Sequence, residues 1–563
     1  MKFLCLSVLI FLVSCVSKQA LQMPDPIEHV AIENQTDSHR IFFCAKTHEF
    51  KKALDVYSES YTEHNPHLLI RLAKSLLEEG LHHDDVNIQL LSVFAAQIAG
   101  FEKAASLLQK ALLSSFPQVQ LAALHALGSF DSEEAIETIK KAFLSNYFLV
   151  RIEACYILAQ KKRLESLEQI ESLFHKSPKE LKPYFCKLFA FLGTQSSLKY
   201  LKSALVSNKT PMRLQAILQS ALFERREMIP FIKQILTHPN FKEQECAIFA
   251  LSYLKDEGAI NTFKSLLHSP FENVRLAASF ALYQLGIEAT SPIFHLAKQD
   301  NTFALQLLGK IEHSNALLLE KLHSKNVQVR FNAFLALLEK KEVECLTFVK
   351  QFLLQEEYNF GFYPTFSPGG SMQSINVCQV DTKFLQNPQL QEVSFQTKLY
   401  ILTKLFEYPE EAFLPIAKTL LNSNETSLIP VVVAMLETLK SEKAIQLLKK
   451  QATKIGAPFV RIYCVLALFK LKEKGPYFDT LKTWLEKHLI QDFIQLKPQE
   501  QTLPFEQKYE LTVEETSQLL IEATLTIAQH DQKGALDLLL NALGKTKEEN
   551  RYALAGLLMK ALE

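Results

Sequence analysis

Cys15 is the residue whose surroundings best suit covalent chemistry. Met1 and Lys2 give a short positive start, and residues 3–13 are apolar except at Ser7. Eleven helical residues span only about 16 Å, which is too short for a hydrocarbon core of ~30 Å. The segment therefore predicts a secretory signal and not a membrane-spanning helix. A thiolate is a nucleophile, so Cys15 can take a thioether-linked lipid.

The end of this segment, Leu12-Val13-Ser14-Cys15, resembles a bacterial lipobox. The resemblance implies that residues 1–14 are removed and that Cys15 becomes a new N-terminus carrying acyl chains such as palmitate on its sulfur and amine. Three acyl chains exceed the two signals needed for stable anchoring. Val16 stands where enteric inner-membrane lipoproteins have aspartate, so outer-membrane sorting stays open. The alternatives are an ordinary signal segment or an uncleaved anchor over residues 1–16.

Few other residues are spaced for catalysis or metal binding. The only His-Glu pair is His48-Glu49, and one such pair does not make a metal site. The run 82–85 has metal-like composition, but adjacent helical residues point in different directions. We expect instead that Asp84 or Asp85 caps a helix there. With no phosphate-binding glycine loop or nucleophile elbow in the sequence, we predict no catalytic residue, no metal and no cofactor.

Seven cysteines beyond Cys15 remain in the predicted mature chain, at irregular spacing and without a C-x-x-C pair. An odd number at such spacing is not a disulfide framework. We expect most of them to be buried as small apolar side chains. They are Cys44, Cys155, Cys186, Cys246, Cys345, Cys378 and Cys464.

An aromatic cluster lies in residues 346–395, between long helix-like patterns. Clustered aromatic side chains bury large areas at low entropic cost and commonly anchor interfaces. An insertion of this length is also able to fold back over the groove of the protein and bury its own aromatic residues. The candidate partner-binding residues are Tyr358, Phe360, Phe362, Tyr363 and Phe366.

The composition is that of a folded, helix-rich protein. The chain has 563 residues, 48% hydrophobic and 22% charged, with only 15 glycines. Its 61 basic and 61 acidic residues balance, which argues against a dedicated nucleic-acid binder. The length favours either several domains or one repeat array.

Seven segments recur at a spacing of 31 residues without insertion or deletion. A fixed period of 20–50 residues is typical of solenoids, in which each unit buries its apolar face against its neighbours. These segments start at Ile88, Val119, Val150, Leu181, Met212, Glu243 and Val274. A second helical pattern recurs at the same spacing, starting at Ala104, Ala135, Ser166, Ser197, Met228 and Ala259. The register therefore predicts pairs of amphipathic helices, with small residues where they approach closely.

The helix pairs resemble HEAT repeats, particularly the short HEAT-like type of phycobilisome lyases. The resemblance rests on a Val/Met-Arg-x-x-Ala/Cys pattern, and it implies an all-α, right-handed superhelical solenoid. Many HEAT repeats place Asp before this pair, whereas this chain has residues such as Asn146 and Pro270 there. We therefore expect the arginines to stabilise the repeats by binding turn carbonyls or a neighbouring acid. They are Arg151, Arg213, Arg275, Arg330 and Arg461.

The predicted organisation has six parts along the chain. It comprises a signal peptide at 1–14, a tether at 15–40, an N-terminal helical cap at 41–87, HEAT-like repeats at 88–345, the aromatic-rich insertion at 346–395, and C-terminal HEAT-like repeats at 396–563 with an interruption near 490–515.

These features favour a bacterial lipoprotein anchored to the membrane of the cell envelope, on the periplasmic side or at the outer membrane. We expect it to act as a non-catalytic scaffold that binds protein partners and no nucleic acid. One alternative is a phycobilisome-lyase-like or other enzyme. Another is an envelope assembly factor that binds peptide or lipid clients. The sequence names neither the partner nor the oligomeric state.

Overall fold

The computed structural model describes residues 32–47, 49–354, 360–423, 426–454, 458–491 and 513–563. The predicted signal peptide with Cys15, most of the predicted tether, Tyr358 and most of the 490–515 interruption lie outside these residues. Within the described part of the chain, no helix combines the length and apolar character needed to cross a bilayer. The chain divides into two compact units, Met1–Glu63 and His64–Glu563.

The first unit contains helices α1 (Ile32–Lys46) and α2 (Phe50–Ser60), which pack against each other. The rings of Tyr57 and Tyr61 stack with their centroids 5.2 Å apart. The Tyr61 hydroxyl also lies 2.9 Å from that of Ser38, which links α1 to the end of α2.

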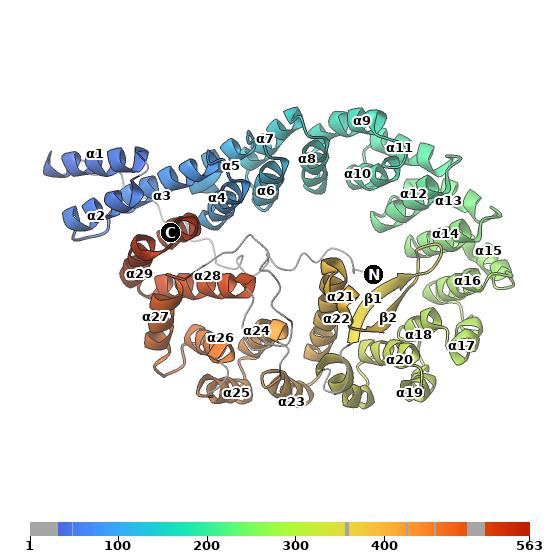
Figure 1. Ribbon diagram of the computed structural model, residues 1–563. Helices are drawn as coiled ribbons and strands as arrows, with labels where there is room; N and C mark the ends of the chain where they lie inside the picture. The colour runs from blue at the N-terminus through green and yellow to red at the C-terminus, as the bar shows by residue number, and fades with distance from the viewer. Residues whose placement is uncertain (1–31, 48, 355–359, 424–425, 455–457, 492–512) are drawn as a thin grey trace. The chain divides into compact units, whose positions relative to one another are not determined.

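In the second unit, the 31-residue register folds into alternating helices, which confirms the predicted all-α solenoid of helix pairs (Figure 1). One layer, here called the inner layer, contains α4 (Val86–Ala99), α6 (Pro117–Gly128), α8 (Phe148–Gln160), α10 (Phe185–Leu192), α12 (Thr210–Leu222), α14 (Phe241–Tyr253) and α16 (Glu272–Gln284). The other layer contains α5 (Phe101–Ala111), α7 (Glu133–Lys141), α9 (Leu167–Lys176), α11 (Gln195–Leu205), α13 (Ile229–Ile235) and α15 (Ile260–Leu266). Each inner-layer helix in this range packs against the next.

Less regular helices continue the array. They are α3 (Pro66–Leu81) before the register and, after it, α17 (Ser291–Lys298), α18 (Thr302–Leu308), α19 (Asn315–Leu322), α20 (Val327–Glu339), α21 (Thr382–Leu385), α22 (Pro388–Phe406), α23 (Glu410–Leu420), α24 (Ile429–Leu439), α25 (Glu442–Ala452), α26 (Pro458–Lys470), α27 (Tyr477–His488), α28 (Val513–His530), α29 (Gln532–Lys545) and α30 (Glu548–Ala561). Short 3₁₀ turns precede several helices of the register, among them α9, α10, α13 and α15.

The core follows the columns of the register. The small residues that were expected to allow close helix approach are all inaccessible to solvent, namely Ala123, Ala154, Ala216, Ala247 and Ala278. Six of the seven cysteines are buried and all seven are free thiols, which confirms their expected role as small apolar residues. Only Cys378 is partly accessible.

The turns that follow six of the seven inner-layer helices, all except α6, share one column of the 31-residue register. A residue with positive φ occurs at Gly100, Lys162, Gly193, Glu224, Lys255 and Gly286. The next residue often donates its N–H back into the helix, as Arg163 does to the Leu158 carbonyl at 2.8 Å and Asp256 to the Leu251 carbonyl at 2.9 Å. This bond pattern is the Schellman motif, which satisfies the last carbonyls of a helix.

The last helix of the second unit closes the array, because α30 packs against both α3 and α4. The contact is tight: a Cβ added at Gly556 would lie 2.3 Å from the Ala95 carbonyl oxygen. Lys103 in α5 also donates to the Met559 carbonyl at 2.5 Å. Nothing in the 31-residue register predicts this contact, because the two surfaces are distant in the sequence.

One β-hairpin interrupts the helical array. Strands β1 (Phe360–Phe366) and β2 (Gln373–Gln379) pair antiparallel, with Phe362 opposite Val377. β2 packs against α18 and α20, while β1 packs against α22 (Figure 1). Residues 360–379 of the aromatic insertion therefore form a hairpin on the inner layer, and no other strand occurs in the described part of the chain. Helical periodicity does not predict this hairpin.

Candidate protein-binding face

A stripe of side chains on α20 defines the side of the inner layer that contacts the hairpin. Gln328, Phe331 and Asn332 all touch it. Positions separated by three and four residues share one face of a helix, so this stripe is a single surface. We call this stripe, together with the equivalent positions of the other inner-layer helices, the inner face.

Two side-chain amides of this stripe bind the main chain of β2 as a neighbouring strand would. Gln328 accepts the Val377 N–H at 2.8 Å and donates to the Val377 carbonyl at 2.5 Å. Asn332, which is fully buried, accepts the Ile375 N–H at 3.0 Å and donates to the Ile375 carbonyl at 2.8 Å. Gln306 in α18 donates to the Asn332 side-chain oxygen at 2.9 Å and so fixes the orientation of that amide. Residues two apart in a strand present their N–H and C=O groups to the same edge. Two side-chain amides four residues apart on a helix, Gln328 and Asn332, can therefore bind Val377 and Ile375 together.

The aromatic residues of the hairpin divide between core and surface. Phe362 is fully buried and stacks on Phe331 of α20, with centroids 4.5 Å apart. Phe360 lies partly buried, 6.4 Å from the ring of Phe352. Tyr363 is partly buried, whereas Phe366 is 46% exposed. Four of the five candidate partner-binding residues are thus placed on one hairpin, but only Phe366 offers a largely free ring.

The tip of the hairpin holds a buried carboxylate from a distant repeat. Glu245 of α14 is fully buried and accepts hydrogen bonds from the hydroxyl groups of Ser367 and Ser371, the latter at 2.6 Å. The Gly369 N–H donates to its second oxygen at 3.0 Å. A Cβ on Gly369 would approach the Lys242 carbonyl to 2.5 Å, so only glycine fits there. These bonds join the insertion to a helix more than 120 residues earlier.

Glu245 and nearby Glu243 were not predicted as site residues from the sequence, although the register contains the signal. The other segments have an apolar residue where Glu243 stands, such as Val150 or Val274. The position of Glu245 is Leu90, Leu121, Ile152, Pro183, Leu214 and Leu276 in the other units. Two acids at apolar columns of a single repeat indicate buried polar partners, since an unpaired buried charge is strongly unfavourable.

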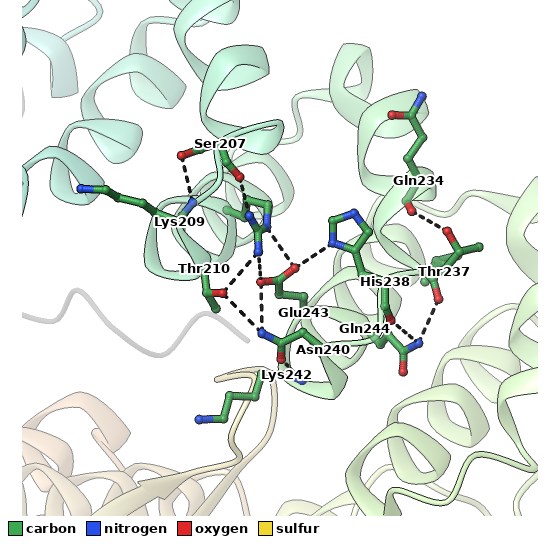
Figure 2. A network of polar contacts seen from close by, with 12 residues as sticks. Ser207, Lys209, Thr210, Gln234, Thr237, His238, Asn240, Lys242, Glu243 and Gln244 are labelled. Atoms are coloured by element: carbon green, nitrogen blue, oxygen red, sulfur yellow. Dashed lines mark hydrogen bonds and ion pairs between the residues drawn. The ribbon is translucent and has the colours of Figure 1, made fainter.

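Glu243 has its own partners in the preceding repeat, shown in Figure 2. The Arg213 guanidinium donates to both of its carboxylate oxygens, at 2.5 and 3.0 Å. His238 Nδ1 lies 3.0 Å from the carboxylate, and Asn240 donates to it at 3.2 Å. Burial disfavours the ionised form of Glu243, but the bonds from Arg213, His238 and Thr210 outweigh it and lower the pKa of this carboxyl.

The arginine column stabilises turns. Each of four predicted arginines donates Nη1 to the carbonyl of the residue six positions earlier, namely Arg151 to Ser145, Arg213 to Ser207, Arg275 to Ser269 and Arg330 to Ser324. Glutamines at the same column make the same bond, which the sequence analysis overlooked: Gln89 to His83, Gln120 to Ser114 and Gln244 to His238. Arg461 is exposed, and the residue six positions before it lies outside the described residues.

The hairpin covers only part of the inner face. Leu276 of α16 and Phe331 of α20, at equivalent positions, are fully buried. Leu149 in α8 is 65% exposed, and Tyr184, in the 3₁₀ turn that leads into α10, is 71% exposed. Lys187 of α10 has its ammonium 4.8 Å from the centre of the Tyr156 ring in α8. Among the described residues, this part of the face presents apolar, aromatic and cationic groups together.

The remaining chemical candidates have structural roles where they are described. Asp85 caps α4 by accepting the Asn87 N–H at 2.9 Å, which confirms the predicted capping. Burial raises the pKa of the Cys155, Cys186 and Cys464 thiols to about 12, so these cysteines are poor nucleophiles. Across the described ranges, His, Cys, Asp and Glu side chains form no cluster of three suited to a metal ion.

Comparisons with known proteins give one family match and several similar solved structures. A family described as HEAT repeats matches residues 73–159, from α3 to α8. No curated protein matches the chain. Similar solved structures include an engineered protein (16% identity, TM-score 0.25, covering 72% of this chain and 99% of that one) and yeast importin-beta, Kap95p (13%, 0.35, 87% and 72%). Kap121p is a third (10%, 0.35, 91% and 73%). The chain is an all-α solenoid, and its residues 73–159 match the HEAT-repeat family.

Proposed function

We propose that this protein is a membrane-anchored bacterial lipoprotein whose HEAT-repeat array acts as a non-catalytic scaffold and binds protein partners on its inner face. The observation that carries the proposal is the binding of β2 by the amides of Gln328 and Asn332. The inner face already holds an extended polypeptide through its main chain, a mode that needs no enclosed pocket. The contiguous part of the face, with Leu149 and Tyr184 exposed, is the proposed partner surface.

Anchoring by Cys15 supports this role, because it would keep the array at the membrane while leaving its inner face for a partner. The competing functions are a phycobilisome-lyase-like or other enzyme and an envelope assembly factor that binds peptide or lipid clients. Site chemistry, and not fold, has to carry an enzymatic assignment. The buried, poorly ionised thiols favour the scaffold over cysteine-based chemistry.

Site-specific photocrosslinking in living cells tests partner binding. A photoreactive amino acid at Tyr156 or His125, on the inner face, is expected to capture discrete protein partners. The matched control places it at Lys264, an exposed position of α15 in the other layer. Equal capture at Lys264, or capture of lipid alone from Tyr156, would reject a protein-binding inner face.

Anchoring is tested separately by membrane flotation of the Cys15→Ala variant. Loss of acyl attachment at Cys15 should move the protein out of the membrane fraction at high salt, where electrostatic attachment is screened. If the Cys15→Ala variant floats as the wild type does and mass spectrometry finds no acyl group on Cys15, the lipoprotein assignment is rejected. The crosslinking test of partner binding does not depend on this result.

A further inference from the structure

The two edges of the repeat array, where the loops between helices lie, differ sharply in their side chains. One edge consists of the loops that lead into the inner-layer helices, here called the entry edge, and comprises residues 113–117, 144–148, 176–182, 206–211, 237–242 and 268–272. The opposite edge consists of the loops that leave those helices, and comprises residues 129–134, 160–166, 193–196, 223–228 and 254–259. The entry edge has six loops and the opposite edge has five, and both runs lie between α5 and α16.

The entry edge concentrates exposed apolar side chains. Of the 13 large apolar residues that are exposed among the described residues, six belong to it: Leu113, Leu144, Tyr147, Leu181, Val206 and Phe271. Leu144 is 87% exposed at the tip of its loop. The opposite edge contributes only Leu164 to the same 13.

The entry edge is also cationic. It carries Lys176, Lys179, Lys182, Lys209 and Lys242 against the two acids Glu180 and Glu272. In the described part of the chain, none of these five ammonium groups has a carboxylate within ion-pair distance. An open hollow of about 530 Å³ lies between two of the loops, lined by Lys179, Lys182 and Lys209 together with Pro183 and Met212.

The opposite edge has the reverse character. Eight acids and six bases lie there, and six of these fourteen groups form ion pairs with one another or with the helices: Lys161 with Asp131 at 2.6 Å, Arg163 with Glu133, Lys140 with Glu165, and Lys233 with Asp256 at 2.9 Å. A self-paired, polar edge is what contact with water alone requires. The entry edge, with its exposed apolar residues and its lysines, therefore differs from the opposite edge of the same protein.

Contacts between neighbouring loops make the entry edge one continuous surface. The Tyr147 hydroxyl donates to the Ser115 carbonyl at 2.5 Å, and Ser145 donates to the Gln120 side chain at 2.6 Å. Farther along the array, the rings of Phe241 and Phe271 stack with centroids 4.7 Å apart. The loops thus hold their apolar and cationic side chains in fixed spacing along successive repeats.

From this arrangement we infer that the entry edge lies against a bilayer surface containing anionic phospholipid. Isolated Leu, Val, Tyr and Phe side chains on loop tips can enter the interfacial region, while lysines reach the phosphate groups with their long stems. Lysine near an anionic leaflet attracts it electrostatically. A bilayer is favoured over an acidic protein because these exposed apolar groups are spread singly or in pairs over five of the six loops and are not gathered into one patch. The inference is independent of Cys15 but would orient the anchored array of the proposed function.

Tryptophan fluorescence in vesicles containing brominated phospholipid tests the contact on the full chain. The single native tryptophan is replaced by Trp484→Phe, and a new one is introduced as Leu144→Trp on the entry edge. The matched control is Leu164→Trp, on the opposite edge, where the parent side chain is 57% exposed. We expect the Leu144→Trp probe to be quenched by vesicles containing phosphatidylglycerol and the Leu164→Trp probe to stay unquenched.

Charge reversal separates membrane contact from simple proximity. The triple variant Lys179→Glu, Lys209→Glu and Lys242→Glu should weaken the contact roughly 100-fold, about fivefold for each lysine near the anionic surface, and abolish the quenching. The control triple Lys162→Glu, Lys199→Glu and Lys255→Glu changes the net charge equally and should leave the quenching unchanged.

Three results would overturn the inference. They are equal quenching of both probes, equal quenching by vesicles of phosphatidylcholine alone, and a spectral response of the Leu144→Trp probe to polyglutamate but not to vesicles. The last result would identify a docking surface for acidic protein. If the quenching test fails but Cys15 is acylated, only the membrane contact of the entry edge is rejected. If Cys15 is not acylated but the Leu144→Trp probe is quenched as expected, only the lipid anchor is rejected.

Discussion

Asn332 holds both backbone groups of Ile375, accepting its N–H at 3.0 Å and donating to its carbonyl at 2.8 Å. A helix thereby supplies β2 with the partner that a third strand would otherwise provide. The arrangement satisfies the free edge of a two-stranded sheet, which would otherwise be open to pairing with another chain. It also fixes the hairpin against α20 without relying on apolar contact alone.

We expect Asn332→Leu to destabilise the protein and release β2. Leucine leaves the Ile375 N–H and carbonyl without partners, at a cost of about 2–4 kcal/mol in the free energy of unfolding. Urea denaturation measures the loss, and hydrogen exchange at residues 373–379 should rise selectively. Asn208→Leu, at an exposed loop position, serves as the control and should change stability by less than about 0.5 kcal/mol. Unaltered exchange in β2 would contradict the role of Asn332.

The buried pair of Glu243 and Arg213 predicts a pH-dependent stability. The pKa of Glu243 is lowered in the folded protein, so its ionised form contributes stability above the unfolded pKa of about 4.3. That contribution disappears as the pH falls through the lower folded pKa. Glu243→Gln should therefore cost about 3 kcal/mol at neutral pH and progressively less below pH ~4.

Urea midpoints of the two proteins between neutral and acidic pH measure this difference. Glu272→Gln, at an exposed carboxylate, is the control and should follow the wild-type curve. A constant gap between wild type and Glu243→Gln down to low pH would show that the charge of Glu243 does not stabilise the fold.

Lys255 illustrates a strained turn whose relief should stabilise the protein. Its φ of 56° lies in the left-handed region, which glycine occupies at the equivalent Gly193 and Gly286. Lys255→Gly is expected to raise the free energy of unfolding by about 1 kcal/mol. Lys199→Gly, inside α11, should lower it by about 1 kcal/mol, because glycine is unfavourable within a helix. If thermal denaturation shows that both variants change the stability in the same direction, Lys255 does not occupy a strained turn.

Gly556 is expected to control closure of the array. A Cβ there would meet the Ala95 carbonyl oxygen at 2.3 Å, and backbone on both sides cannot yield cheaply. Gly556→Val should separate α30 from α4 and expose Ala95 and Tyr552, lowering stability by about 3 kcal/mol or more. Hydrogen exchange in α4 and α30 locates the effect. Gly544→Ala, where nothing lies within 4 Å, should be neutral or stabilising.

The repeats themselves could be predicted from the sequence, and the reason is physical. Helix pairs that bury each other's apolar stripes need local periodicity, and this periodicity is written every 31 residues from Ile88 to Val274. The column that contains Arg151 and Gln120 likewise acts within one turn, so its bonds to carbonyls six residues earlier follow from the local register. Buried cysteines at irregular spacing follow from composition.

Tertiary structure alone decided the contacts between distant segments. The hairpin tip meets Glu245 across more than 120 residues, and α30 meets α4 across more than 450. No periodic pattern encodes such pairs, because each depends on the summed curvature of many repeats. From the sequence, Glu245 is only an acid in an apolar column. The serine and glycine donors that make its burial stable come from the hairpin tip, and only the three-dimensional arrangement brings them to Glu245.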